Sequence, residues 1–273
     1  MTEVLADPGV DPVADPLSAA IALRDRDTLK MVDIAVRAGN VMLAFQPIMQ
    51  ARTPGRLAFF EGLIRVQDQT GRTIPARDFI DVVETHEIGR ILDCLALQRG
   101  IDALARHPDL RLSINMSARS IGYRRWTETL ERGIATNPSI AGRLILEITE
   151  ASAMVMPDIV QVFMAELHAK GITFALDDFG AGFTSFRYLK RFEFDILKID
   201  GQFIRDVHSD SDNQVLMHAL ISIAQQFEMF TVAEAVETAR EARFLTALGI
   251  DCLQGHYLGA PKLKPDWRLT SAP

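Results

Sequence analysis

Between about residues 39 and 259 the chain alternates short apolar segments with amphipathic ones, and this repeat limits the folds open to it more than any other feature. Each apolar segment has the length and composition of a β-strand, and segments with helical periodicity fill the gaps. The candidate strands are 42–49, 57–66, 110–117, 143–150, 172–179, 194–200, 229–236 and 251–258. The candidate helices are 77–106, 119–135, 157–170, 210–228 and 238–248. Such alternation predicts a mostly parallel sheet, and eight strands in 273 residues favour a closed barrel.

The connection between the first two candidate strands departs from this pattern. It runs only from residue 50 to residue 57 and contains Pro54 and Gly55. A parallel crossover needs about a dozen residues or more, so these two strands should pair antiparallel as a hairpin. The fold class predicted is therefore α/β, an irregular TIM-type (β/α)8 barrel with an antiparallel first strand. We expect a disordered leader over 1–16, an N-terminal helix over 17–38 and the barrel over 39–268.

Polar side chains occur near the ends of the candidate strands after the first. They are Glu61, Asn115, Glu147, Asp177, Asp178, Lys198, Asp200, Glu234 and Gln254. One acid at a strand end is usually a solvated loop residue, but barrels build active sites at this end, so a polar residue on seven strands predicts one shared site. Asp177 and Asp178 are adjacent and would point to opposite faces of a regular strand. Both can face the site only if the strand ends or distorts there.

Several acids at one barrel mouth would repel one another and raise one another's pKa unless positive charge compensates them. Lys198 alone cannot do so. Hard divalent cations can, and Mg²⁺ or Mn²⁺ prefers oxygen ligands of this kind. None of the six histidines has the spacing of a zinc site. An oxygen-only cluster with one lysine suits two-metal phosphoryl chemistry, in which the ions clamp a phosphate and activate a water.

Charge and composition limit the partners. The net charge of −7 does not attract nucleic acid through the overall field of the protein. Cys94 and Cys252 lie in apolar surroundings without a CxxC pattern, which indicates buried, reduced thiols. The N-terminus lacks the features of a signal peptide, and no apolar run approaches about 18 residues, the length of a membrane span. We expect a cytoplasmic protein with no DNA, RNA or membrane partner.

Seven sequence blocks in this order resemble the signatures of EAL-type cyclic di-GMP phosphodiesterases. They are FFEGLIR, SINMS, LEITE, LDDFGAGFTSF, LKID, VAEAVET and QGHYLGAP, and the resemblance covers about residues 30–265. It implies hydrolysis of cyclic di-GMP to linear pGpG with two Mg²⁺ or Mn²⁺ ions. It also implies a homodimer and is compatible with protein signalling partners.

The resemblance assigns roles residue by residue. The metal ligands implied are Glu61, Asn115, Glu147, Asp177, Asp178 and Glu234. The catalytic residues are Glu61, Lys198, Asp177 and Asp178, with Lys198 acting on the hydrolytic water. The substrate contacts expected are Arg65, Gln46, Gln254, Glu237 and Asp200, and Arg65 would meet a phosphate. Glu150 would anchor the loop 179–186, which in this family links the metal site to a dimer interface.

The chain departs from the family pattern without losing a ligand. Gly62 stands in place of the Ala of EAL, which should loosen the strand slightly. Ala181 and Phe183 differ in the loop, and Ala235 replaces a glycine. The loop also carries Phe179, Phe183 and Phe186, which must pack inward or against a partner. Two alternatives to an active enzyme remain, an EAL-like receptor that binds cyclic di-GMP without cutting it and a protein-interaction module that binds no nucleotide.

Overall fold

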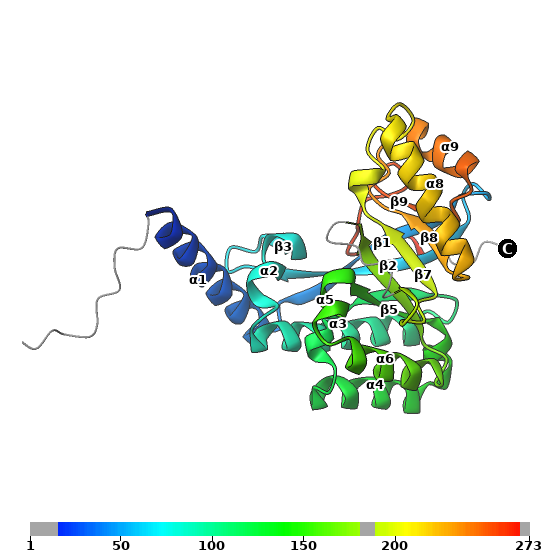
Figure 1. The fold of residues 1–273 in the computed structure, drawn as a ribbon. Coiled ribbons are helices and arrows are strands. Elements are labelled where there is room, and N and C mark those ends of the chain that lie inside the picture. Colours follow the sequence, from blue (N-terminus) through cyan, green and yellow to red (C-terminus); the bar gives the residue numbers. More distant parts are fainter. Residues whose placement is uncertain (1–15, 181–188, 268–273) are drawn as a thin grey trace, which may run out of the picture.

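The computed structural model describes residues 16–180 and 189–267, and its centre is a closed β-barrel (Figure 1). The strands are β1 (Val41–Gln50), β2 (Leu57–Gln67), β3 (Thr73–Pro75), β4 (Leu112–Asn115), β5 (Leu144–Thr149), β6 (Thr173–Phe179), β7 (Ile196–Ile199), β8 (Phe230–Ala233) and β9 (Cys252–Gln254). They follow the order β1-β9-β8-β7-β6-β5-β4-β2, and β1 also pairs with β2, which closes an eight-stranded ring. The short β3 adds to β2 outside the ring.

The antiparallel first strand is confirmed. β1 runs antiparallel to β2 on one side and to β9 on the other, whereas every pairing from β2 through β4 to β9 is parallel. Gly55, in the hairpin loop, has a φ of 80°, which a residue with a Cβ rarely adopts. The predicted irregular barrel is therefore correct, and the short first connection is its cause.

Most of the helices cover the barrel from outside. The helices are α1 (Pro16–Arg37), α2 (Ile80–Val83), α3 (Glu87–Arg106), α4 (Arg124–Thr136), α5 (Glu150–Val155), α6 (Pro157–His168), α8 (Ser211–Gln226) and α9 (Ala239–Leu248). Of these, α1 and α2 lie beside the barrel (Figure 1). Short 3-10 turns lie at η1 (Ala76–Asp78), η2 (Ala118–Ser120), η3 (Pro138–Arg143) and η4 (Gly201–Phe203). Local sequence fixes some of these limits clearly. α9 begins with a capping box between Thr238 and Glu241 and ends at Gly249, which has a φ of 101°.

The barrel interior has an apolar layer below a polar one. The apolar layer is one cluster of buried residues: Ile48, Phe59, Ile145, Ala175, Ile196, Val232 and Cys252. Two positions further along their strands, on the same face, lie the polar residues expected at the mouth, such as Glu61, Glu147 and Lys198. On β1 the order is reversed, and Gln46 precedes Ile48, because this strand runs the other way. Each of the eight ring strands thus places a polar side chain at the same mouth, although β1 runs in the opposite direction.

A smaller lobe extends the structure beside the barrel. A separate buried cluster joins α1, α2 and α3 to β3 and to the ends of β1 and β2, and includes Val32, Val41, Val66 and Ile74. The first half of α1 stands clear of this lobe (Figure 1), and its Leu17 is 66% exposed. The leader predicted over 1–16 lies, up to residue 15, outside the described residues. Within the described ranges, every helix is too short or too polar to cross a membrane.

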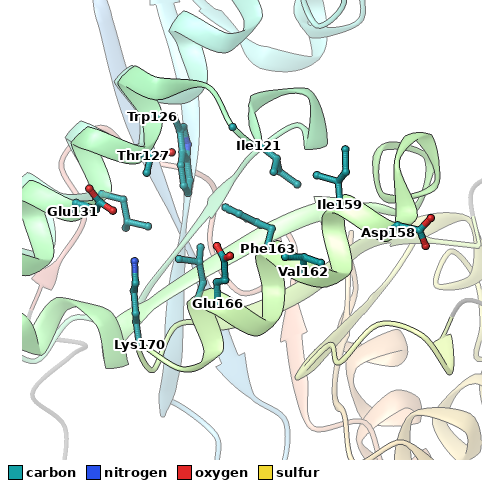
Figure 2. A pocket seen from close by; sticks show the side chains of 13 residues that line it. Ile121, Trp126, Thr127, Glu131, Asp158, Ile159, Val162, Phe163, Glu166 and Lys170 are labelled. Atoms are coloured by element: carbon teal, nitrogen blue, oxygen red, sulfur yellow. The ribbon is translucent and has the colours of Figure 1, made fainter.

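An apolar groove lies on the outer layer of the barrel between α4 and α6 (Figure 2). It has a volume of about 510 Å³, and the buried Trp126 and the exposed Val162 are among its lining residues. Its lining shares no residue with the strand-end polar group at the barrel mouth. The groove is therefore a separate feature of the helical layer.

Candidate active site

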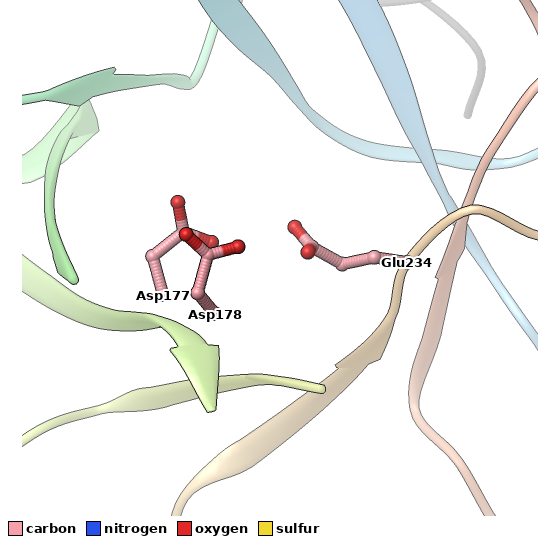
Figure 3. A group of neighbouring side chains, drawn as sticks. All are labelled: Asp177, Asp178 and Glu234. Carbon is pink, nitrogen blue, oxygen red and sulfur yellow. The ribbon is translucent and has the colours of Figure 1, made fainter. Parts of the chain in front are cut away.

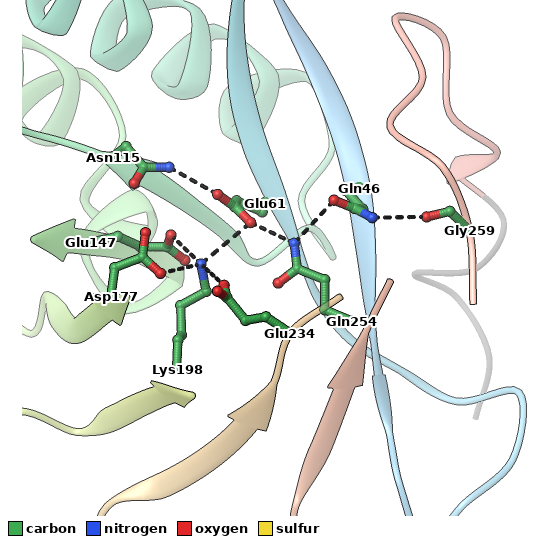
Figure 4. A network of polar contacts seen from close by, with 9 residues as sticks. All are labelled: Gln46, Glu61, Asn115, Glu147, Asp177, Lys198, Glu234, Gln254 and Gly259. Carbon is green, nitrogen blue, oxygen red and sulfur yellow. Dashed lines mark hydrogen bonds and ion pairs between the residues drawn. The ribbon is translucent and has the colours of Figure 1, made fainter. Parts of the chain in front are cut away.

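Lys198 lies at the centre of the barrel mouth, surrounded by carboxylates from four other strands or strand ends (Figure 4). Its Nζ lies 2.8 Å from an oxygen of each of Glu147, Asp177 and Glu234, and 3.4 Å from Glu61 Oε2. The lysine is 1% exposed. Because the ammonium reaches every one of these strands, the predicted convergence of strand-end residues exists in the folded chain.

Side-chain amides hold Glu61 from the other side. Asn115 Nδ2 donates to Glu61 Oε1 at 2.9 Å, and Gln254 Nε2 donates to Glu61 Oε2 at 2.5 Å. Gln254 Nε2 also lies 3.2 Å from Gln46 Oε1, and Gln46 Nε2 donates to the carbonyl of Gly259 at 3.1 Å. These bonds fix the Glu61 carboxylate and line one wall of the mouth with Gln46 and Gln254 (Figure 4).

The adjacent aspartates both reach the site because β6 is distorted. Asp178 has a φ of 53°, in the left-handed region that non-glycine residues rarely adopt. The register between β6 and β7 shifts between Leu176 and Phe179. As a result, Asp177, Asp178 and Glu234 bring oxygen atoms within 4.8 Å of one another (Figure 3). The alternation of side chains along a strand required a distortion of this kind for both aspartates to face one site, and β6 has it.

The charges in this cluster perturb one another strongly. Burial alone would lower the pKa of Lys198, but its carboxylate neighbours raise it well above its usual value. Burial, together with repulsion from other carboxylates, raises the pKa of Glu147 and Glu234 well above the usual range. Burial and repulsion from Asp177 raise the pKa of Asp178 to about 6.

Glu61 behaves differently from the other acids. Burial would raise its pKa, but Lys198 and the amide donors lower it below its usual value. Glu61 is therefore held as a carboxylate, whereas the raised pKa values of Glu147, Glu234 and Asp178 favour their protonation. A cluster in which most acids are driven toward protonation lacks positive charge.

Comparison with known proteins identifies the family. Residues 29–261 match the EAL domain family. The chain belongs to this family. The EAL domain is 31% identical over 232 residues to the bifunctional diguanylate cyclase/cyclic di-GMP phosphodiesterase MucR of Pseudomonas aeruginosa, a match that covers 83% of this chain and 34% of MucR. It is 29% identical over 232 residues to the cyclic di-GMP phosphodiesterase PdeF of Escherichia coli, covering 84% of this chain and 31% of PdeF. The chain thus spans about a third of the length of these relatives.

Solved structures of other EAL proteins share the fold. The structure described as the PaMucR phosphodiesterase in complex with c-di-GMP superposes with a TM-score of 0.74 at 29% identity, covering 86% of this chain and 97% of that one. The FimX EAL domain from Pseudomonas aeruginosa, bound to c-di-GMP, superposes with a TM-score of 0.80 at 23% identity, covering 88% and 98%. At that identity the second likeness shows the fold alone.

EAL proteins use divalent metals, and the residues of this EAL domain fit them. The donors at the mouth are carboxylate and amide oxygens, which Mg²⁺ and Mn²⁺ prefer. Glu147 Oε1 is buried and has no hydrogen-bond partner within the described residues. Asn115 donates its Nδ2 to Glu61, and its Oδ1 has no hydrogen-bond partner in the described part of the chain. Divalent cations would also supply the positive charge that the pKa shifts show to be lacking.

The remaining expected residues occupy less central positions. Arg65 follows Glu61 on the same face of β2, is half-buried, and donates to the carbonyl of Ile64 at 2.9 Å. Asp200 caps η4 by accepting from Gln202 N at 2.7 Å. Glu237 is exposed, and among the described residues no hydrogen bond or ion pair joins its side chain to the Lys198 cluster. Glu150 is buried and accepts from Gly180 N at 3.4 Å, at the start of the loop it was expected to anchor.

The sequence did not indicate Ser113 and marked Ala235 only as a departure from the family pattern. Ser113 is fully buried beside Glu61 in the β2–β4 register, and its hydroxyl has no hydrogen-bond partner among the described residues. Ala235, directly after Glu234, has a φ of 50°, so it adopts a conformation that suits glycine. The glycine expected here from the family pattern was a signal for this backbone shape.

Proposed function

We propose that this EAL domain hydrolyses cyclic di-GMP to linear pGpG in a reaction that depends on two Mg²⁺ or Mn²⁺ ions. The observation that carries the proposal is the complete oxygen-donor set around Lys198. The residues that would hold the ions are Glu61, Asn115, Glu147, Asp177, Asp178 and Glu234. All six lie at the same mouth of the barrel, and each keeps a free or shared oxygen facing it.

The protein's own groups prepare the reaction. Bound divalent ions would activate a water and polarise the scissile phosphate. In the metal-free protein its carboxylate neighbours raise the pKa of Lys198, so the side chain is a protonated hydrogen-bond donor and a positive charge at the mouth. It would orient the attacking water and offset charge that develops on the phosphate. Asn115 and Gln254 hold Glu61 in one orientation, which reduces the motion needed to reach the reactive geometry.

Substrate recognition would fall to the rim of the mouth. Arg65 is the cationic side chain placed on the same strand face as Glu61, and a guanidinium suits a bidentate phosphate contact. Gln46 on β1 lies directly across the strand pair from Glu61, and Gln254 lies on the adjacent β9, so both present amides beside Glu61. Asp200 and Glu237 follow the ends of β7 and β8. We propose all five as substrate contacts.

A test of turnover separates the competing functions. Purified protein is incubated with cyclic di-GMP and Mg²⁺ or Mn²⁺, and the products are separated by chromatography. We expect pGpG, no product after EDTA treatment, and recovery when metal is restored. Full activity in a metal-free preparation would contradict the two-metal mechanism. Binding without pGpG would identify a receptor, and the absence of binding would identify an interaction module.

We also propose a homodimer formed by α8 and the loop after β6. Val215 and Leu216 on α8 are 69% and 44% exposed, which is unusual for neighbouring large aliphatic side chains. Phe179 packs inward with 1% exposure, whereas Phe183 and Phe186 lie outside the described residues. Light scattering of the wild type and of Val215→Asp tests the interface. A wild type that stays monomeric at micromolar concentration, together with a fully active Glu150→Ala variant, would refute the dimer and the anchoring role.

A further inference from the structure

The six-residue helix α5 follows directly after β5, the strand that carries Glu147. Its start is fixed because Thr149 caps it, accepting from Ser152 N at 3.2 Å. Glu150 and Ser152 are both buried, each with 6% of its surface exposed. The short helix therefore turns polar side chains toward its neighbours and away from solvent.

One of these side chains reaches the β6 turn. Gly180 N, two residues after Asp178, donates to Glu150 Oε2 at 3.4 Å. Gly180 has a φ of 94°, and an added Cβ would lie 2.3 Å from the ring of Phe203. The chain leaving the two aspartates is thus closely confined, and α5 supplies one of its contacts.

The other side chain reaches the β4 turn. Ser152 Oγ accepts from Ala118 N at 2.8 Å and lies 3.4 Å from Ser117 Oγ. Ala118 is fully buried, so its N–H has no access to solvent. This turn begins two residues after Asn115, the proposed ligand on β4.

The far side of the β4 turn is tied to the lobe beside the barrel. Asp93 on α3 accepts from Ser117 N at 3.0 Å, and Glu84 accepts from Ser117 Oγ at 2.9 Å. The turn is consequently held between α3 on one side and α5 on the other. Ser152 makes the contact from the α5 side.

We infer that Ser152 is a positioning residue that, through α5, fixes the Asn115 turn relative to the Asp177–Asp178 turn. The inference rests on the proposed metal-dependent function. Strands β4, β5 and β6 are neighbours in the ring, so α5 sets the spacing of the proposed ligands from three strands. Ligand geometry must be held closely for metal binding, and partners that orient ligands commonly contribute about 10- to 100-fold to affinity.

The test compares two variants that each lose one buried hydroxyl. Ser152→Ala leaves Ala118 N without its partner. Thr231→Val is the control, because Thr231 Oγ1 accepts from Asp251 N at 3.0 Å at the opposite end of the barrel. Isothermal titration with Mn²⁺ should show binding about 10-fold weaker in Ser152→Ala and unchanged in Thr231→Val. The kcat for cyclic di-GMP should fall in Ser152→Ala without a rise in KM.

Two further variants guard against a folding artefact. Ser152→Thr keeps the hydroxyl and should restore most of the Mn²⁺ affinity. Ser152→Cys keeps the side-chain volume but accepts hydrogen bonds weakly, and it replaces the alanine variant if that variant does not fold. Equal Mn²⁺ affinity in Ser152→Ala and wild type, or an equal loss in Thr231→Val, would overturn the inference.

Hydrogen exchange distinguishes this inference from the proposed function. In Ser152→Ala, exchange should accelerate at the amides of both Ala118 and Gly180, because one helix braces both turns. If the wild type neither binds Mn²⁺ nor cuts cyclic di-GMP, the proposed function fails. The exchange rate of the Gly180 amide in Ser152→Ala then still tests whether α5 connects the two turns. An unchanged Gly180 amide in Ser152→Ala would show that α5 does not connect the two turns.

Discussion

At the scale of single residues, Glu61 and Arg65 have different proposed roles at the mouth, Glu61 in catalysis and Arg65 in substrate binding. Glu61 contacts Lys198, Asn115 and Gln254, whereas Arg65 lies four residues further along the same strand face. Glu61→Ala should lower kcat roughly a thousandfold, equivalent to about 4 kcal/mol of transition-state stabilisation. Arg65→Ala should mainly raise KM, about 10-fold or more, because a charge-assisted bond to phosphate is lost in the ground state as well.

Steady-state kinetics with cyclic di-GMP measure this split. Arg72→Ala is the control. Arg72 lies between β2 and β3 with its side chain 76% exposed, so this variant should change neither constant. A fall in kcat alone for Arg65→Ala, with KM unchanged, would contradict its assignment to substrate binding.

Gly62 shows how one departure from the family signature is absorbed. A Cβ at this position would lie 2.6 Å from Ile114 Cδ1, and a Cβ at Gly100 would lie 2.9 Å from the same atom. Ile114 is 1% exposed, so its side chain fills the space that an alanine would need. Gly62→Ala should therefore destabilise the fold by about 1–3 kcal/mol through overpacking.

A second substitution should remove most of that cost. Ile114→Val deletes Cδ1 and by itself should cost about 0.5–1.5 kcal/mol. In the double variant the two effects should couple by more than about 0.5 kcal/mol, because the added and deleted methyl groups share one space. Urea unfolding of all four proteins gives the cycle, and strictly additive free energies would disprove the shared space.

The sequence predicted the membership of the site better than its backbone. Residue types and strand-end spacing identified the acids around Lys198, because alternation along a strand decides which side chains face the mouth. The left-handed conformations of Asp178 and Ala235 depend on neighbouring strands. For Asp178 the sequence indicated only that the strand must distort if both aspartates face the site, and for Ala235 the signal was the glycine that the family pattern has there. Ser113 gave no signal, because a serine in a strand is common.

At the scale of elements, Arg143 joins a helix end to the base of β5. Its Nη1 lies 3.0–3.1 Å from the carbonyl oxygens of Leu104, His107 and Leu110, where α3 ends. These carbonyls have few partners within the helix, and a cation also suits the negative end of its dipole. Arg143→Ala should cost about 2 kcal/mol of unfolding free energy.

Thermal or urea unfolding measures this loss, and kcat should stay unchanged because Arg143 lies at the other end of the strand from the mouth. The exposed Arg132 on α4 provides the comparison, and Arg132→Ala should stay within about 0.5 kcal/mol of wild type. An equal effect of the two substitutions would show that the cap contributes nothing specific.

Element boundaries were less predictable than element types. The helix expected over 77–106 is interrupted, and η1, α2 and α3 share that range. The break brings Gly89 so close to the preceding turn that an added Cβ would lie 2.7 Å from the carbonyl oxygen of Val83. The last strand is shorter than expected because Gly255 turns away with its backbone packed against Val236. Such contacts form only in the folded chain, and local periodicity does not report them.

At the scale of the whole molecule, metal and protons should compete. The folded, metal-free protein retains a proton on Asp178 up to about pH 6, whereas the unfolded chain releases it near 3.8. The folded state therefore binds more protons in this window, and this group's contribution to stability falls as pH rises through it. Metal binding must displace the proton, so apparent Mn²⁺ affinity should decrease as pH falls below about 6.

Differential scanning fluorimetry with and without Mn²⁺ across pH 4 to 7.5 checks this. The metal-induced rise in Tm should be small at the acid end and grow toward neutral pH. Asp178→Asn removes one of the titrating groups and should weaken that dependence, while Glu147 and Glu234, whose pKa values burial also raises, still titrate. A rise in Tm that is constant across the range would contradict competition at this carboxyl.

β1, the strand that closes the ring, also determines how late in synthesis the barrel can close. β1 forms its second set of ladder bonds with β9. Ile48 can therefore pair with Gln254 only after most of the barrel sequence has been synthesised. During synthesis, a ribosome-bound chain that lacks residues 252–254 keeps two unpaired sheet edges, on β1 and on β8, and such edges invite association with other chains. Gln46 and Gln254, which face each other across this seam, meet only at that moment. The wall of the mouth that would contact substrate is thus completed last, after all six proposed metal ligands have been synthesised.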